Sequence, residues 1–284
     1  MLPAQFKSWT SAGIIALMVL PFAVFGATIR DDTPDSDYVA FGNEPAFDSV
    51  GTFTANLSGC GILIAPDWVL TAAHLILNAS SGTFTLDGTS YSATQIITDP
   101  NWNGNPSAGS DFALVHLSSS LTAIPPAMLY NGSTPLGQTA TFVGYGLTGT
   151  GLTGYKTPLD GQKRGVQAVV DVNNSDFGNT TYVFGATFES PANGALPLEG
   201  CVAPGDSGGG VFFSDGSQYY LAGVTSFVAA TDGNANSSYG DISGFDSILP
   251  ALPWITSVVP EPSTIALLGV STITLIWRQK HQRR

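Results

Sequence analysis

Short runs of β-branched and aromatic residues, separated by turns rich in glycine and proline, make up the central part of the chain. Between positions 51 and 240 no stretch keeps the apolar spacing that a helix needs over several turns. The runs with strand character are 61–64, 112–117, 141–143, 166–172 and 219–224. This pattern predicts an all-β architecture.

The N-terminal end departs from this pattern. Lys7 precedes an apolar run over 12–25, which is closed by the small residues Gly26 and Ala27. The run is shorter than the roughly 20 residues that a membrane-spanning helix needs, so a membrane helix is the weaker alternative. Residues 1–27 are therefore expected to be a secretory signal peptide, removed by signal peptidase near these small residues.

The C-terminal end has three parts: Pro260-Glu261-Pro262, an apolar run over 265–277, and a basic tail with Arg278, Lys280, Arg283 and Arg284. The apolar run is too short for a permanent anchor, so only transient membrane contact is expected, with the basic tail on the cytoplasmic side. Segment 258–284 resembles the PEP-CTERM sorting signal of exopolysaccharide-producing Gram-negative bacteria. That resemblance implies cleavage near the Pro-Glu-Pro motif by an exosortase, and delivery to the cell surface, the extracellular matrix or the medium.

Charge narrows the classes of partner. The 284 residues carry a net charge of −12. Removing both end segments leaves four basic residues against 20 acidic ones, a net charge of about −16. The remaining chain has too few lysines and arginines to bind nucleic acid through its phosphates. The acidic stretch 31–37 lacks a complete calcium-loop motif and is interpreted as a solvated linker, and no metal or cofactor is expected.

The candidate chemistry begins with Ser207, which lies in Gly205-Asp206-Ser207-Gly208-Gly209. Glycines on both sides permit a tight turn that exposes the serine hydroxyl, and the amides of Gly205 and Ser207 can then point at one developing oxyanion. A serine needs a base, and His74, in Thr71-Ala72-Ala73-His74, is the candidate. Asp111 is the candidate that orients the histidine.

Only three histidines occur in the chain, which limits the choice of base. His281 lies in the basic tail, and His116, within Leu114-Val115-His116-Leu117, is interpreted as a solvated strand residue. His74 remains. Its imidazole titrates near neutrality and can take the serine proton and return it to a leaving amine.

The order His, Asp, Ser, with the segments around each residue, resembles the trypsin-like (chymotrypsin-fold) serine proteases over roughly 50–255. The supporting segments are 58–64, 68–74, 111–114, 142–146, 205–209, 223–227 and 253–255. The resemblance implies two antiparallel six-stranded Greek-key barrels, with the active site at their interface and a short C-terminal helix. We expect the first barrel with its leading segment over 28–130 and the second over 131–257, joined near 123–127. The implied activity is that of a serine endopeptidase acting on proteins or peptides through an acyl-enzyme.

Activation departs from the family pattern. Most members mature to an Ile-Val-Gly-Gly N-terminus that pairs with the aspartate before the nucleophile, and this tetrapeptide does not occur here. Asp206 is present without an identified partner. Signal cleavage can liberate a terminus near Thr28 and Ile29, or another donor can serve. We therefore expect activity without a separate proteolytic activation.

Cysteines depart from the pattern too. Cys60 matches a family half-cystine, but Leu75 stands where its partner follows the histidine. Pairing of Cys60 with Cys201 is the alternative, and free thiols are favoured.

Cys201 and Ser226-Phe227-Val228 match the substrate-binding region of the family. Cys201 stands six residues before Ser207, where trypsin-type members carry an aspartate, and Val228 stands where glycine is common. We therefore expect cleavage after small or medium apolar residues. A surface or matrix binding protein that uses a protease fold without catalysis is the alternative. An esterase is disfavoured because its triad order begins with serine.

Overall fold

The computed structural model describes residues 27–157, 160–178 and 181–260. The expected signal peptide, except for Ala27, and the sorting segment after position 260 lie outside these ranges. Among the described residues, no helix has both the length and the apolar character needed to cross a bilayer.

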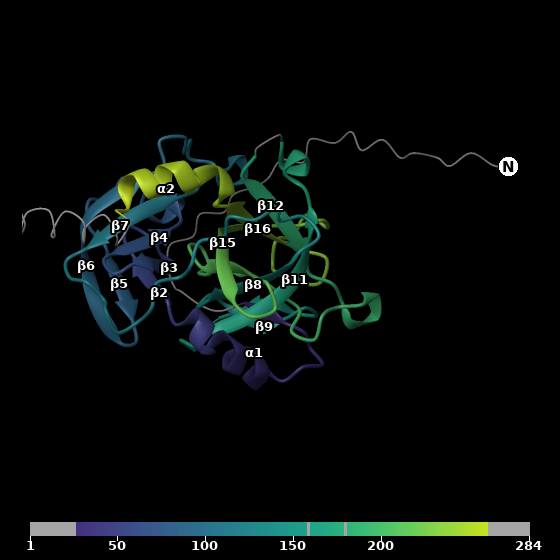
Figure 1. Ribbon diagram of the computed structural model, residues 1–284. Helices are drawn as coiled ribbons and strands as arrows, with labels where there is room; N and C mark the ends of the chain where they lie inside the picture. Colours follow the sequence, from purple (N-terminus) through teal and green to yellow (C-terminus); the bar gives the residue numbers. More distant parts are fainter. Residues whose placement is uncertain (1–26, 158–159, 179–180, 261–284) are drawn as a thin grey trace, which may run out of the picture.

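Two closed antiparallel barrels of six strands each form the body of the molecule, as the resemblance implied (Figure 1). The first barrel runs in the order β2-β3-β4-β7-β6-β5. Its strands are β2 (Val50–Thr54), β3 (Ser58–Ala65), β4 (Trp68–Thr71), β5 (Thr83–Leu86), β6 (Thr89–Thr98) and β7 (Ala113–Leu117). Alternate side chains such as Phe53, Ile62 and Phe84 are fully buried inside it, which removes large apolar surfaces from water.

The second barrel runs in the order β11-β12-β16-β15-β14-β8. Its strands are β8 (Thr139–Gly144), β11 (Arg164–Val172), β12 (Val183–Thr187), β14 (Gly210–Ser214), β15 (Tyr219–Ala229) and β16 (Ile242–Ser247). Phe142 and Phe245 pack edge to face in its core, with ring centroids 5.9 Å apart.

All five expected strand runs lie within observed strands, or overlap them to within one residue. Strand β5 was not among the expected runs because it is only four residues long, although Phe84 and Leu86 alternate with threonines. Strand β6 was not among them because it is rich in threonine and serine and has no buried residue, so its apolar alternation is weak.

The leading segment packs on the second barrel, although it precedes the first in sequence. Strand β1 (Thr28–Ile29) lies between β9 (Thr148–Thr150) and β13 (Gly200–Cys201), and β10 (Gly154–Lys156) completes this small sheet. Helix α1 (Asp35–Gly42) then lies against β11. A side chain on Gly42 would meet the backbone of Arg164 at 2.5 Å, so only glycine permits this close approach.

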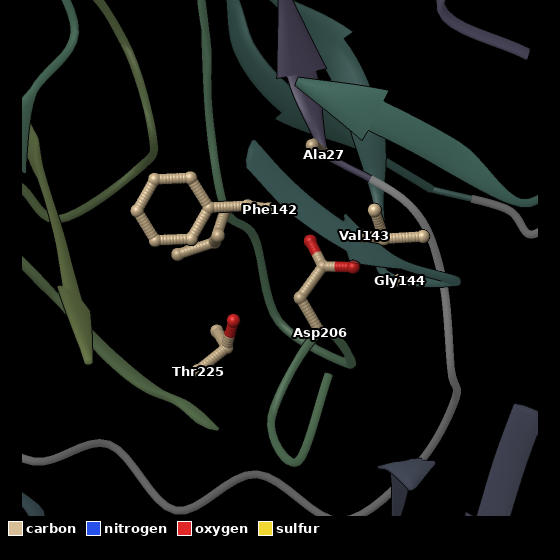
Figure 2. A pocket seen from close by; sticks show the side chains of 7 residues that line it. Ala27, Phe142, Val143, Gly144, Asp206 and Thr225 are labelled. Carbon is tan, nitrogen blue, oxygen red and sulfur yellow. The ribbon is translucent and has the colours of Figure 1, made fainter. Parts of the chain in front are cut away.

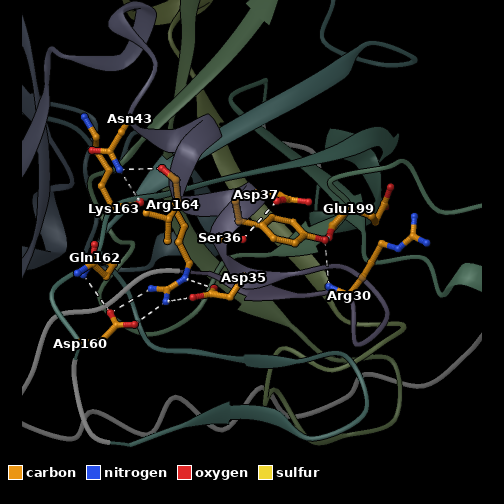
Figure 3. Close-up of polar contacts among 12 residues, drawn as sticks. Arg30, Asp35, Ser36, Asp37, Asn43, Asp160, Gln162, Lys163, Arg164 and Glu199 are labelled. Atoms are coloured by element: carbon orange, nitrogen blue, oxygen red, sulfur yellow. Dashed lines mark hydrogen bonds and ion pairs between the residues drawn. The ribbon is translucent and has the colours of Figure 1, made fainter.

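The acidic stretch 31–37 is not the solvated linker expected from sequence, because its second half begins helix α1. Arg164 is 2% exposed, and its guanidinium bonds Asp35 through Nε (2.7 Å) and Nη2 (2.8 Å). Asp160 holds its other edge (Figure 3). The carboxylate that was assigned to solvent thus fastens the helix to the second barrel.

The chain crosses between the barrels after Ala127. The Ala127 amide bonds the Leu63 carbonyl in the first barrel, and Leu129 bridges Leu221 in the second. At the far end, helix α2 (Leu252–Val258) returns to cover the first barrel, where Ile255 is buried (Figure 1). The remaining short helices are of the 3-10 type: Pro45–Phe47, Ala73–Leu75, Pro106–Ala108, Asn174–Phe177, Pro191–Asn193 and Leu249–Ala251.

Candidate active site

His74 and Asp111 meet at one end of the first barrel. His74 lies in the 3-10 turn after β4, and Asp111 lies just before β7, the strand that pairs with β4. Asp111 Oδ1 accepts the His74 backbone N–H (2.8 Å), and Oδ2 lies 2.6 Å from His74 Nδ1. With Nδ1 donating its proton to this carboxylate, Nε2 is left with a lone pair that can take a proton.

A third donor reaches Asp111 from the second barrel. The Ser226 hydroxyl, in β15, donates to Asp111 Oδ2 at 2.5 Å, and the Asp111 side chain is fully buried. Ser226 was expected to bind substrate, and the structure directs its side chain to the acid instead. The buried charge is therefore balanced by three donors drawn from both barrels.

The pKa of His74 lies above its ordinary value of 6.5. Burial by itself lowers it, but the charge of Asp111 and the hydrogen bond to it outweigh the burial. The ring is nonetheless 19% exposed, so a substrate can reach it.

Ser207 lies on a turn between β13 and β14 that glycines allow. Gly205 (φ 97°) and Gly208 (φ 80°) adopt left-handed conformations. The Ser207 carbonyl accepts the Cys60 amide of β3 at 2.7 Å, and the Gly208 amide donates to Thr225 of β15 at 2.8 Å. The turn is thereby tied to β3 of the first barrel and to β15 of its own barrel.

The segments that carry Ser207 and His74 lie side by side, but no hydrogen bond joins the two side chains in the described part of the chain. A side chain on Gly59 would meet the Ser207 carbonyl at 2.4 Å and the Leu75 side chain at 2.7 Å, so the two segments are packed against the same glycine. No hydrogen bond of the Ser207 hydroxyl occurs among the described residues. In serine hydrolases without ligand this contact is often loose and tightens when substrate binds.

Two backbone amides beside the serine are free. Within the described ranges neither the Gly205 amide nor the Ser207 amide donates to a protein group, and both residues are partly exposed. Cys60 Sγ supports the turn from below, since it donates to the Gly205 carbonyl (3.3 Å) and accepts the Tyr145 amide (3.3 Å). Free, oriented amides of this kind can stabilise negative charge on an oxygen.

Asp206 is buried behind the turn. Its Oδ1 accepts the Gly146 amide (2.7 Å) and its Oδ2 the Ala203 amide (2.9 Å). No cation of the described chain pairs with it, and burial raises its pKa to about 7. Ala27, 3% exposed, lines the same small pocket as Asp206 (Figure 2). Sequence reasoning had left the partner of Asp206 open and had ended the signal peptide at Ala27.

The expected substrate-binding residues lie along β15 and β13. Strand β14 pairs with β15 only as far as Val224, so the partly exposed stretch that includes Phe227 and Val228 has one edge without a β14 partner. Val228 lies opposite Ser243 of β16. The Ser243 hydroxyl donates to Cys201 Sγ at 3.4 Å, and both residues are fully buried.

Ser243 was missed from sequence, because nothing in its local sequence shows that its strand lies opposite Val228. Phe227 turns its ring over Gly244, where a side chain would meet it at 2.5 Å. The ring also packs edge to face on Phe177, with centroids 5.3 Å apart.

The two cysteines are free and buried, as favoured from sequence. Burial raises the pKa of both thiols, that of Cys201 to about 12, so neither is a thiolate near neutrality. His116, 36% exposed, lies 2.8 Å from the Thr94 hydroxyl and 3.4 Å from Asp67, which agrees with a solvated strand residue.

Comparisons with known proteins agree with this geometry. The trypsin family model matches residues 42–255, and the model of the PEP-CTERM protein-sorting motif matches residues 258–284. Chymotrypsin-like elastase family member 1 of Rattus norvegicus is 30% identical over 217 residues, covering 70% of this chain and 77% of the relative. The protein of the same name from Canis lupus familiaris is 30% identical over 225 residues, covering 70% and 80%.

Among solved structures, neuropsin, described as a serine protease expressed in the limbic system of mouse brain, superposes with a TM-score of 0.59 at 22% identity. The match covers 76% of this chain and 96% of neuropsin and concerns the fold. The chain therefore belongs to the trypsin family of serine endopeptidases and carries a C-terminal PEP-CTERM motif, which indicates export in a Gram-negative bacterium.

Proposed function

We propose that this exported endopeptidase cleaves peptide bonds through Ser207, with His74 as its base and Asp111 as the residue that orients the base. The observation that carries the proposal is the meeting of two half-sites at the barrel interface. The first barrel supplies a hydrogen-bonded His74–Asp111 pair, and the second supplies a glycine-framed serine with two free amides beside it.

The chemistry follows from the donors and acceptors present. Ser207 Oγ attacks the scissile carbonyl while its proton passes to His74 Nε2, and Asp111 stabilises the imidazolium. The carbonyl oxygen becomes an oxyanion that the amides of Gly205 and Ser207 receive. His74 then protonates the leaving amine, which yields an acyl-enzyme. A water molecule then attacks the acyl-enzyme with His74 as its base, which releases the carboxylic acid product and free Ser207. The reaction needs no cofactor.

Substrate would bind as an extra strand along the edge of β15 near Phe227 and Val228, with main-chain hydrogen bonds. The pocket beside it would be bounded by Val228, Cys201 and Ser243, none of which carries a charge. The Val228 side chain narrows the pocket, and the Ser243–Cys201 contact closes its base. We infer a preference for small or medium apolar residues before the cleaved bond, and the elastase names of the relatives are consistent with this.

Signal cleavage between Gly26 and Ala27 would supply the missing partner of Asp206. The new α-ammonium would start in the pocket that Ala27 and Asp206 share, and would be held there by the pairing of Thr28 with Cys201 and Gly149. This junction lies one residue before the boundary expected from sequence. The ion pair would fix the turn that carries Gly205 and Ser207, so that signal peptidase completes the enzyme.

The sorting motif supports release from the inner membrane by an exosortase-type enzyme and display on the surface or in the matrix. Mass spectrometry of the native protein is expected to start at Ala27 and to end near Pro262. A protein that retains the basic tail would contradict the proposed processing.

Labelling with a fluorophosphonate tests the nucleophile. The wild-type protein and S118A, a matched change at an exposed serine outside the site, should be labelled equally. S207A should not be labelled, and H74A should be labelled at least 100-fold more slowly. Labelling that survives S207A would reject Ser207 as the nucleophile.

A comparison of two N-termini tests the role of Ala27. Protein that begins at Ala27 should be active, whereas the same chain preceded by one uncleaved glycine should lose at least 90% of its activity. Equal activity of the two forms would reject an α-ammonium at Asp206 while leaving the triad proposal intact.

A further inference from the structure

Asp246 places a second carboxyl group directly behind the catalytic acid. It lies in β16 of the second barrel, is completely buried, and accepts the backbone N–H of Asp111 through Oδ2 at 2.5 Å. Its Oδ1 has no hydrogen-bond partner among the described residues. A buried carboxyl with an unpaired oxygen is costly and rare, so its presence needs a reason.

The backbone before β7 explains why an acceptor is needed there. Ser110 has a φ of 61°, which is unusual for a residue other than glycine, and β7 begins only at Ala113. The Asp111 amide therefore takes no part in the strand ladder of the first barrel and points toward the second. Without Asp246 this buried amide would have no acceptor, and a buried donor without an acceptor destabilises the fold around it.

Two neighbouring strands of the second barrel thus hold the same residue of the first. Ser226, in β15, bonds the carboxylate of Asp111, and Asp246, in the adjacent β16, bonds its backbone. The Ser226 contact fixes the carboxylate of Asp111, and the Asp246 contact fixes the backbone from which that side chain extends. Together they determine where the Asp111 carboxylate lies relative to His74 Nδ1.

We propose that Asp246 is a positioning residue of the active site, which holds the Asp111 backbone across the barrel interface so that the Asp111 carboxylate stays aligned with His74. The proposal rests on the assignment of His74 and Asp111 made above. Asp246 acts through Asp111 and does not contact substrate.

The pKa of Asp246 fits this role. Burial raises it well above the ordinary value, and the charges of Asp111 and, more weakly, Asp99 raise it further, while the amide of Asp111 opposes them. A second negative charge beside Asp111 is therefore disfavoured.

Paired substitutions test the proposal. D246N keeps a neutral group of the same shape whose oxygen can accept the Asp111 amide. D246L keeps the approximate volume but removes the acceptor, and D246A serves in its place if D246L does not fold. D99N is the matched control, since Asp99 is a neighbouring buried acid whose carboxylate accepts the Asn101 amide and whose backbone amide donates to the Phe112 carbonyl.

We expect D246N and D99N to keep kcat within threefold of the wild-type value, with the acid limb of kcat/KM unmoved. The folded variant without an acceptor should lose at least 30-fold in kcat with KM within threefold, and its acid limb should move to lower pH. A folded D246L or D246A with wild-type kcat and an unmoved acid limb would overturn the positioning role. A fall of about one pH unit in the D246N acid limb would show instead that Asp246 acts on His74 through a charge and not as a hydrogen-bond acceptor, and would overturn the positioning role.

A spectroscopic signal separates this proposal from the proposed function. The proton between His74 Nδ1 and Asp111 should give a low-field NMR resonance in the S207A background, where no hydrolysis is needed. It should persist in S207A/D246N and be lost or move upfield in S207A/D246L or S207A/D246A. An unchanged resonance in the variant without an acceptor would reject the alignment by Asp246, whatever reaction the protein catalyses.

Discussion

The Ser226 hydroxyl donates a 2.5 Å hydrogen bond to Asp111 Oδ2, so a strand of the second barrel holds an acid that belongs to the first. The same oxygen lies 2.6 Å from His74 Nδ1. The pair of barrels is thus joined at the carboxylate itself, and the geometry of the triad depends on how the barrels dock.

Replacing Ser226 tests this link. S226A removes one of three donors to Asp111, and a hydrogen bond to a charged group contributes about 1.5 to 3 kcal/mol. We expect kcat/KM to fall roughly tenfold, with the acid limb moved to higher pH because the less solvated carboxylate holds the imidazolium more strongly. S226T keeps the hydroxyl and should stay near wild type. If S226A and S226T gave identical profiles, the hydroxyl would have no such role.

The acid limb of activity should follow His74. Its pKa is raised above 6.5, because the Asp111 charge and hydrogen bond outweigh burial, and only the neutral ring can accept the serine proton. The kcat/KM of the free enzyme should therefore fall as pH drops, with a midpoint above 6.5. D111N should lower activity about 10⁴-fold, since the ring loses its orienting partner. A midpoint well below 6 in the wild type would contradict the pairing.

The alkaline limb should follow the α-ammonium of Ala27. Pairing with Asp206 would raise the pKa of this group above its ordinary value of about 7.7 to 8.0. Its contribution to stability is complete below the ordinary value and is lost as pH rises through the raised one. Activity should therefore decline reversibly at alkaline pH, above the ordinary range of an α-ammonium, together with loss of the folded turn as followed by fluorophosphonate labelling. Constant labelling rates up to pH 10.5 would speak against the ion pair.

The width of the substrate pocket should depend on Val228. V228G removes the side chain that narrows the entrance, and we expect kcat/KM for phenylalanyl over alanyl substrates to rise at least tenfold. V169G, at an exposed valine on β11, is the matched control and should leave the ratio unchanged. An unaltered ratio in V228G would place the pocket elsewhere, as would strong cleavage after arginine by the wild type.

Helix α1 should detach when Arg164 loses its partners. The Arg164 guanidinium is 2% exposed, whereas Asp35 and Asp160 are 48% and 39% exposed. Loss of both ion pairs therefore destabilises the fold mainly because a buried cation is left without a partner. We expect D35N/D160N to lower the free energy of unfolding by about 3 kcal/mol in a urea titration, because breaking a buried pair leaves an uncompensated charge. D37N is the control in the same first turn: the exposed Asp37 carboxylate accepts the hydroxyl of its neighbour Ser36, so its replacement should change stability little. Equal stability of the two variants would show that the helix is held by apolar contacts alone.

Local sequence was sufficient for the glycine-framed turn at Ser207 and for the strands of high β propensity. The glycines around Ser207 permit one kind of tight turn, and runs such as 166–172 have β-branched residues at the positions that pack in the barrel. His74 could be chosen because the alternatives were few, and the order of the three residues indicated the family. Such signals lie in residues that are neighbours in the sequence, so they can be recognised without knowing the tertiary structure.

Tertiary structure alone decided which distant groups complete the site. Nothing in the local sequence of Ser226 or Asp246 shows that their side chains meet Asp111, 115 and 135 residues away in the chain. Ala27 was expected to end the signal peptide, and only the structure shows that it lines the same pocket as Asp206. The physical reason is that a hydrogen bond across the barrel interface depends on the docking of two closed sheets, whereas residue type and spacing record only what each strand buries by itself.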